Sequence, residues 1–365
     1  MKENHTKRIL KKLLFFLPIL LMLVIVNFAV DPSNSFRTSD FERQLADWIN
    51  NGYNIEGIYD FDERIFQEFC IEKFKERKEV IVLGSSRGIQ INQEMFFGKT
   101  FFNNCVSGAS LEDLMAVYNI YDRCNLNPDI IILSIDPWMF NKNNDQTRWM
   151  SISDEYWQLK NKMGFKTALF KKILFNKTVF KIKKYSNVFS ISHFQHSIHI
   201  LLEYKGLEYK KNIIKTLNSN GETNFKISDG SINYGPHITK KTQDEIKKGV
   251  LYEIAKKNYF GLNNFKKLNP RLKNDFEKFI EYLESKNVKV VILLFPYHPI
   301  YYKSIENNPN LNLVPETEIY LKKFAEENSI DIYGSYNPNI YDLNDSDFYD
   351  EMHLKKENIP SIFKD

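Results

Sequence analysis

Short apolar runs recur along the chain, and each is bounded by polar residues or glycine. The clearest runs occupy 79–84, 129–135 and 288–295, and weaker ones occupy 100–104 and 330–333. Apolar runs of this length without polar alternation are typical of strands that are buried on both faces. The sequence therefore predicts several strands of a parallel sheet.

Segments with apolar residues at helical spacing alternate with these strands. They lie at 110–124, 275–285 and 316–328, and in the first of them Ser110 and Asp113 have the spacing of a capping box. Strands that alternate with helices predict a three-layer α/β fold, in which a parallel sheet is covered on both faces by helices in the flavodoxin-like manner.

The stretch 141–268 shows no buried strand, and we expect a mostly helical insertion there. It divides the α/β core into 78–140 and 269–365, and residues 31–77 are predicted to form an amino-terminal segment of short helices. Within the insertion, 160–184 carries nine lysines and no acidic residue. This basic segment would bind anionic lipid headgroups or a phosphate-bearing polymer, or would be a solvated helix face.

The amino terminus predicts the compartment. Residues 13–30 carry no charge, and at about 1.5 Å per residue such a helix would be about 27 Å long, close to a hydrocarbon core. Basic residues precede it in a short tail, 1–12, and Asp31 follows it. By the positive-inside rule we expect a single-pass protein of the cell membrane whose remaining chain lies outside the cytoplasm. A cleaved signal peptide is the alternative.

Charge and cysteine content narrow the function classes. The chain has 50 Lys and Arg against 46 Asp and Glu, an excess too small to indicate a nucleic-acid partner. Cys70, Cys105 and Cys124 have no spacing typical of a disulfide scaffold or a zinc site. An enzyme outside the membrane has no supply of ATP or NADH. We therefore expect hydrolysis or group transfer without a cofactor.

Two motifs near opposite ends of the α/β core carry the chemistry. Ser86 directly follows the apolar run 79–84, and Asp350 lies three positions before His353 in a polar loop. Acyl transfer needs a nucleophile, a base that accepts its proton, and a carboxylate that holds the base in the right tautomer. The ends of parallel strands meet at one edge of a sheet, so these residues are expected to gather there. A helix after Ser86 would aim its N-terminal amides at the developing negative charge.

These blocks resemble the SGNH (GDSL-like) hydrolase superfamily over 78–138 and 288–356, especially its membrane-anchored extracytoplasmic members. Gly84-Ser85-Ser86 stands where that family has its nucleophile motif, and Asp350 and His353 match its last block. The segment 103–108 fits the second block, whose glycine, here Gly108, gives a backbone donor to the oxyanion. From the chemistry of these residues we expect an acyl-serine intermediate and an envelope glycan or its lipid-linked precursor as substrate. The resemblance implies a cell-surface polysaccharide or teichoic acid. It also implies a multispanning acyltransferase as a possible partner.

The third block departs from the family pattern. The family has an asparagine there that donates to the oxyanion, whereas this chain has Asp136, and an ionised carboxylate only accepts hydrogen bonds. One missing oxyanion donor typically costs about 3 kcal/mol of transition-state stabilisation. Asn103, Arg87 and Trp138 are the candidates to replace it. If none does, the alternative function is a weak or inactive glycan-binding or scaffold subunit that keeps the fold.

Several of these residues also have other interpretations. Arg87 would steer an anionic substrate or pair with a nearby acid, and Trp138 would be a sugar-stacking platform or a packed rim aromatic. A metal site is the rival use of the acid and imidazole side chains. It would need His237, His298, His353 and Asp350 to gather, but they have no metal-ligand spacing.

Overall fold

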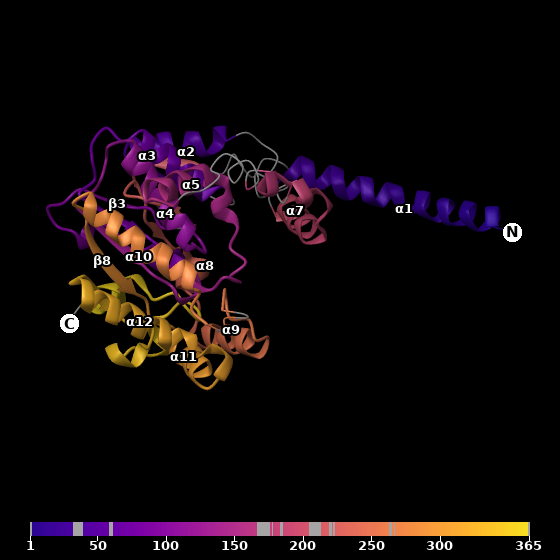
Figure 1. Cartoon of the computed structure of the whole chain (residues 1–365). Coiled ribbons are helices and arrows are strands. Elements are labelled where there is room, and N and C mark those ends of the chain that lie inside the picture. The colour runs from indigo at the N-terminus through magenta and orange to yellow at the C-terminus, as the bar shows by residue number, and fades with distance from the viewer. Residues whose placement is uncertain are drawn as a thin grey trace.

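A computed structural model describes most of the chain and places an α/β body beside a long amino-terminal helix (Figure 1). The description covers residues 2–31, 39–57, 61–165, 176, 178–182, 185–203, 213–218, 221, 223–262, 265 and 267–363.

A five-stranded parallel sheet forms the centre of the body. Its strand order is β3-β2-β4-β8-β9, and every neighbouring pair is parallel. The strands are β3 (Phe101–Asn103), β2 (Val80–Leu83), β4 (Ile130–Ser134), β8 (Lys289–Leu294) and β9 (Asp331–Gly334). All five predicted strands are confirmed. For β2, β4 and β8 the signal is a mostly apolar run, which is typical of a strand covered on both faces.

The expected alternating helices are also present. The predicted segments become α4 (Leu111–Arg123), α10 (Pro270–Ser285) and α12 (Leu313–Asn328). Ser110 and Asp113 form the predicted capping box at the start of α4. Other helices of the body, among the described residues, are α2 (Asp40–Asn50), α3 (Glu63–Glu72), α5 (Ser153–Lys162), α8 (Pro236–Thr239), α9 (Gln243–Ala255) and α11 (Pro299–Glu306).

A second sheet, which is antiparallel, corrects the prediction of one parallel sheet with a mostly helical insertion. Its order is β5-β1-β6-β7, with β5 (Ile214–Thr216), β1 (Asn54–Glu56), β6 (Phe225–Lys226) and β7 (Ile232–Asn233). Three of these strands come from the predicted insertion. Strands of two or three residues carry no measurable apolar period, and β1 pairs with residues about 160 positions away, so local sequence gave no signal.

The coverage of the parallel sheet also differs from the predicted three layers. Alternate residues of its strands enter two separate apolar clusters, as for Leu133 on one face and Ile132 on the other. Helices α4, α10 and α12 supply the first cluster. Within the described residues, turns, 3-10 segments and strand ends cover the second face, including Ile89, Phe348 and Ile359. The three-layer prediction is therefore wrong, because the described α-helices pack against one face of the sheet and not the other.

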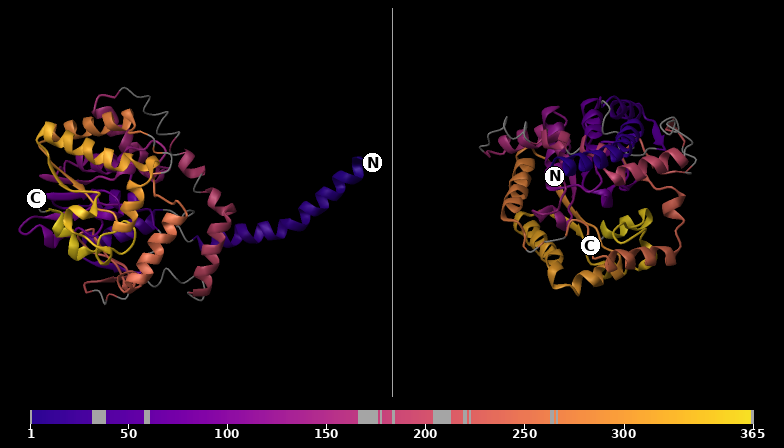
Figure 2. Two further views of the ribbon diagram at one scale, coloured as in Figure 1. Left: turned by 90° about the horizontal axis from the view of Figure 1, so that it is seen from below. Right: turned by 90° about the vertical axis from the view of Figure 1, so that its right-hand side faces the viewer.

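The amino-terminal helix α1 (Lys2–Val30) projects from the body in Figure 1 and in the left view of Figure 2. Its last turns pack on α7 (Ile191–Glu203), where Val30 and Ile200 are buried together. The buried side-chain amide of Asn27 donates to the carbonyls of Asn187, Val188 and Ser190 at 3.2, 2.9 and 3.1 Å.

The prediction of a membrane-spanning helix at 13–30 is corrected as well. Across the part of the chain that the structure describes, no helix combines the length and the apolar character needed to cross a membrane.

The first lysines of the predicted basic segment are held in ion pairs. Lys160 pairs with the buried Asp275, and the Nζ atom of Lys162 lies 2.6 Å from Asp122. These two lysines therefore belong to the packing of α5 against the body. Six others fall outside the described residues, namely Lys166, Lys171, Lys172, Lys177, Lys183 and Lys184.

Two phenylalanines give a matched test of the packing. Phe276 is fully buried, with its ring 5.5 Å from those of Phe140 and Phe324, whereas Phe97 is fully exposed. Phe276→Ala should lower the free energy of unfolding by about 3–5 kcal/mol, because it leaves a cavity. Phe97→Ala should change it by less than about 0.5 kcal/mol. Urea unfolding measures both, and equal losses would contradict this core assignment.

Candidate active site

Three side chains from distant parts of the chain form a continuous hydrogen-bonded relay. The Nε2 atom of His353 lies 2.9 Å from the Oγ atom of Ser86. The Nδ1 atom of the same ring lies 2.9 and 2.8 Å from the two carboxylate oxygens of Asp350. Ser86 and His353 are half-buried, so solvent reaches the relay. The structure thus brings together the three residues that the two motifs predict.

The end of β2 explains how Ser86 is presented. Gly84 passes so close to the end of β4 that an added Cβ would lie 2.5 Å from the Cβ atom of Ser134. Only glycine fits at this position without displacing the neighbouring strand. Ser85 then caps a 3-10 helix at Ser86–Gly88, its Oγ atom accepting the N–H of Arg87 at 3.2 Å. The helix predicted after Ser86 is therefore this single short turn, which is too short to have a macrodipole of consequence.

The loop that carries the acid and the base is fixed by its own backbone. The Oδ1 atom of Asp350 accepts the N–H groups of Met352 and His353 at 3.0 and 2.9 Å. The N–H of His298 donates to the carbonyl of Glu351 at 3.0 Å, which ties the loop to the segment after β8. The relay geometry is consequently built into the resting fold.

The charges of the pair influence each other's pKa. Burial opposes the ionised form of Asp350, but the imidazole of His353 and the two backbone N–H donors outweigh it and lower its pKa to about 2. Burial also opposes the imidazolium of His353, yet the carboxylate of Asp350 raises the pKa of the ring above its usual value of 6.5. The pair is therefore suited to take up a proton on His353 while Asp350 stays ionised.

Arg87 is buried and structural, so of its two interpretations the pairing with a nearby acid holds and the steering of an anionic substrate does not. Its Nη1 atom donates to Asp136 at 3.0 Å, its Nε atom donates to the carbonyl of Met352 at 3.1 Å, and its Nη2 atom donates to the carbonyl of Phe295. The guanidinium also lies 4.1 Å from the ring centre of Tyr297. Both side chains of the ion pair are fully buried, so Asp136 is the partner of a buried cation.

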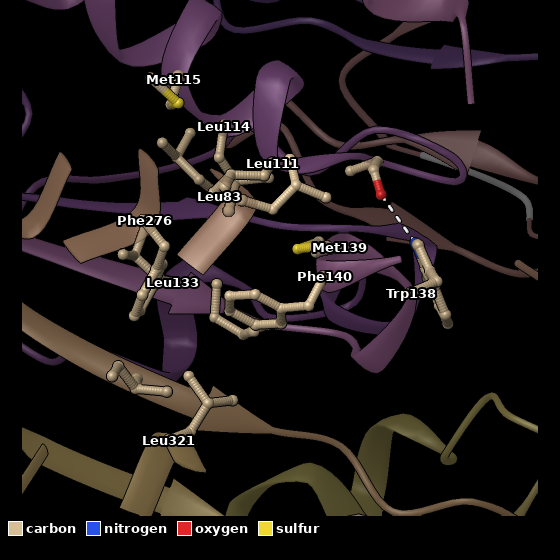
Figure 3. Packing of buried hydrophobic residues seen from close by; sticks show 14 of the residues in the cluster. Leu83, Leu111, Leu114, Met115, Leu133, Trp138, Met139, Phe140, Phe276 and Leu321 are labelled. Carbon is tan, nitrogen blue, oxygen red and sulfur yellow. Dashed lines mark hydrogen bonds between the residues drawn. The ribbon is translucent and has the colours of Figure 1, made fainter. Parts of the chain in front are cut away.

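The side-chain donors of the two other predicted oxyanion candidates are also already hydrogen-bonded to backbone carbonyls. The amide nitrogen of Asn103 donates to the carbonyls of Gly88 and Ile91 at 2.9 and 2.8 Å, and so holds the turn after Ser86. The indole nitrogen of Trp138 donates to the carbonyl of Ala109 at 2.9 Å (Figure 3). Trp138 is 1% exposed, so of its two interpretations the packed aromatic holds and the sugar-stacking platform does not.

Gly108 lies in a turn that is clamped beside the Ser86 segment. The N–H of Val106 donates to the carbonyl of Gly84 at 3.0 Å. The first turn of α3 holds this turn from the other side. The N–H of Ser107 donates to the carboxylate of Glu63 at 2.6 Å, and the guanidinium of Arg64 donates to the carbonyl of Ser107 at 2.9 Å. Within the described residues, the amide N–H groups of Ser86 and Gly108 donate to no protein acceptor. Both are therefore available to an oxyanion.

Two residues of the predicted insertion join the site without any local sequence signal. Tyr234 follows β7, and its ring centre lies 6.5 Å from that of His353. Arg148 follows a polar loop, and its Nη2 atom occupies the space that a Cβ on Gly108 would need. Both belong to segments whose sequence is ordinary for a surface. Only the path of the insertion across the body brings them here.

The rival metal site does not form among the described residues, where no group of three or more His, Cys, Asp or Glu side chains could hold an ion. His298 has another function, since its buried Nδ1 atom accepts the N–H of Ile300 at 3.3 Å and caps α11.

Comparison with known proteins gives a family without an assigned function. The sequence matches a family described as "Protein of unknown function (DUF1574)" over residues 9–362. No curated protein and no solved structure matches it significantly.

The buried Arg87–Asp136 pair gives a stability test. Asp136→Asn should lower the free energy of unfolding by about 3–5 kcal/mol, because it leaves the buried guanidinium without a counter-charge. The matched control is Asp331→Asn, which breaks an exposed pair with Lys289 at 2.7 Å and should cost less than about 1 kcal/mol. Denaturant titration measures both. A negligible loss for Asp136→Asn would contradict the structural role of Arg87.

Proposed function

We propose that this chain, which belongs to the DUF1574 family, is a serine enzyme that hydrolyses or transfers acyl esters. The observation that carries the proposal is the Asp350–His353–Ser86 relay, whose successive contacts are 2.8 and 2.9 Å. A serine hydroxyl, an imidazole and a carboxylate in this order are the groups that acyl transfer requires.

The reaction would begin with proton transfer from Ser86 to His353. The Nε2 atom of His353 accepts the hydroxyl proton as the Oγ atom of Ser86 forms a bond to the ester carbonyl carbon. The tetrahedral intermediate then collapses, the bond to the leaving alcohol breaks, and His353 gives its proton to that alcohol. An acyl-serine remains. Water or an acceptor alcohol, deprotonated by His353, releases the acyl group and restores Ser86.

Asp350 would orient the base and stabilise its charged form. Two carboxylate contacts fix the proton on the Nδ1 atom of His353, so the Nε2 atom faces Ser86 with its lone pair. Because the pKa of Asp350 is about 2, the carboxylate stays ionised while the ring takes up the proton. This supports the assignment of His353 as base and Asp350 as its partner.

The amides of Ser86 and Gly108 are the backbone donors proposed for the oxyanion. Both belong to segments that the Val106–Gly84 hydrogen bond holds together at 3.0 Å. The proposed substrate is an ester-linked acyl group on a cell-envelope glycan, because the sequence blocks resemble those of SGNH hydrolases. A multispanning acyltransferase partner stays a prediction of that resemblance.

A fluorophosphonate probe tests for an activated serine. The wild-type protein should be labelled at Ser86, Ser86→Ala should abolish labelling, and His353→Ala should slow it on the order of 10²-fold or more, because the general base is lost. Ser285→Ala is the matched control, since Ser285 is an exposed serine at the end of α10, and it should label like the wild type. Folded wild-type protein that resists labelling would instead favour the inactive glycan-binding or scaffold subunit.

The pH dependence of ester hydrolysis tests the Asp350–His353 coupling. Neutral His353 is the base, so kcat/KM should rise with pH through the raised pKa of the ring, above 6.5. Asp350→Asn removes the negative charge that favours the imidazolium, so this rise should move to lower pH. The maximal rate should fall on the order of 10²- to 10⁴-fold, because the tautomer is no longer fixed. Asp331→Asn is the control, and its kcat/KM should rise at the wild-type pH. If kcat/KM of Asp350→Asn also rises at the wild-type pH, the coupling between Asp350 and His353 is contradicted.

A further inference from the structure

The proposed chemistry lacks one side-chain donor on the oxyanion side of the site. Asp136 stands where SGNH hydrolases, which the chain resembles, have the asparagine of their third block. It accepts a hydrogen bond from Arg87 and cannot donate in its ionised form. The donors of Asn103 and Trp138 end on the backbone carbonyls of Gly88, Ile91 and Ala109. None of these groups is free to bind the oxygen that becomes negative in the transition state.

Arg148 is the cationic side chain that lies where such a donor is needed. It begins the 3-10 helix Arg148–Ile152, and its guanidinium rests directly against the Cα atom of Gly108, where an added Cβ would collide with Nη2. The Cβ position and the amide nitrogen share that Cα atom. The guanidinium therefore lies beside the Gly108 N–H, which is itself a proposed oxyanion donor.

The hydrogen-bonding capacity of Arg148 is largely unused in the resting structure. Its one hydrogen bond within the described residues is a long one, 3.4 Å from Nη2 to the Oε1 atom of Gln146, and the side chain is exposed. It forms no ion pair with any described carboxylate. A guanidinium has five N–H donors and stays charged at every pH of interest, so most of its donors remain for a ligand.

The carboxylates near Arg148 already accept hydrogen bonds from other partners. Asp113 accepts from Arg64 at 2.9 Å, and Glu63 accepts from the N–H and the hydroxyl of Ser107 at 2.6 and 2.9 Å. Asp62 caps α3 and accepts the hydroxyl of Ser151 at 3.1 Å. The guanidinium of Arg64 donates hydrogen bonds to Asp113, to Glu63 and to the carbonyl of Ser107. Arg148 is thus the cation of this cluster that is not committed.

We propose that Arg148 donates to the oxyanion formed at Ser86, in place of the asparagine that the third block lacks. A charge-assisted hydrogen bond from a guanidinium is stronger than one from a neutral amide. The hydrogen bond from Arg148 would therefore replace the transition-state stabilisation that is missing because Asp136 cannot donate to the oxyanion. A side chain at 108 would displace the guanidinium, because an added Cβ would lie 2.3 Å from Nη2 of Arg148, and the φ of +55° also favours glycine there. This inference rests on the proposed esterase activity.

Hydrolysis of p-nitrophenyl acetate, a neutral ester, by the full-length protein tests the proposal. Arg148→Met should lower kcat on the order of 10²- to 10³-fold with little change in KM, because the interaction exists only in the transition state. Arg148→Lys should retain part of the rate, since it keeps a charged donor. Lys142→Met removes another exposed cation from the same segment, and it should keep the wild-type kcat.

Chemical rescue separates a direct donor from a structural residue. In Arg148→Gly, millimolar ethylguanidinium should restore part of kcat, with no effect on the wild type. A residue needed only for packing would instead lower the thermal unfolding temperature and would not be rescued.

The other possible results show whether the role of Arg148 or the esterase proposal itself has failed. Wild-type turnover with an unchanged kcat in Arg148→Met would overturn the role of Arg148 and leave the esterase proposal standing. A loss confined to the KM of anionic esters would overturn it too, and would make Arg148 a substrate-charge sensor. Folded wild-type protein that neither hydrolyses the ester nor reacts with fluorophosphonate would overturn both proposals.

Discussion

The buried guanidinium of Arg87 is the interaction on which the geometry of the site depends. Its three donor groups end on Asp136 after β4, on the carbonyl of Phe295 after β8 and on the carbonyl of Met352 beside the base. A charge with no solvent contact is stable only where its counter-charge and acceptors are all in place. Arg87 therefore sets the relative positions of the segments that carry Ser86 and His353, although it does not belong to the relay.

This role of Arg87 also accounts for the departure in the third sequence block. A carboxylate at 136 cannot donate to an oxyanion, but it can neutralise Arg87, and a neutral asparagine could not. One side chain at position 136 therefore cannot both neutralise Arg87 and donate a hydrogen bond to an oxyanion. In the proposed reaction the oxyanion donor would therefore come from another segment, and the insertion places Arg148 beside Gly108.

The insertion and the amino-terminal segment thus complete the site that the parallel sheet begins. The sheet brings the ends of β2, β4 and β8 to one edge, which fixes Ser86 and the Arg87–Asp136 pair. The antiparallel sheet carries Tyr234 to His353, and α3 clamps the Gly108 turn through Glu63 and Arg64. The surroundings of the relay are therefore made by segments that carry no recognisable motif.

Local sequence determined the elements whose signal is contained within a few neighbouring residues. A continuous apolar run marks β4 or β8 because such a strand is covered on both faces, and Ser110 with Asp113 marks the start of α4 because the capping box is a contact within one turn. Asp350 and His353 could be paired for the same reason, since they are three residues apart. Ser86 could be selected as the candidate nucleophile because it follows an apolar run and because Gly84-Ser85-Ser86 resembles the SGNH nucleophile motif.

Only the tertiary structure decided what depends on pairing between distant segments. The β1–β5 ladder joins residues about 160 positions apart through backbone groups, and backbone groups are the same in every sequence. Whether Arg87, Asn103 and Trp138 face substrate or the interior depends on which carbonyls the fold places around them, and no residue type reveals that. The same holds for Arg148, an ordinary surface arginine by sequence, whose position beside Gly108 is set by the path of the insertion across the body.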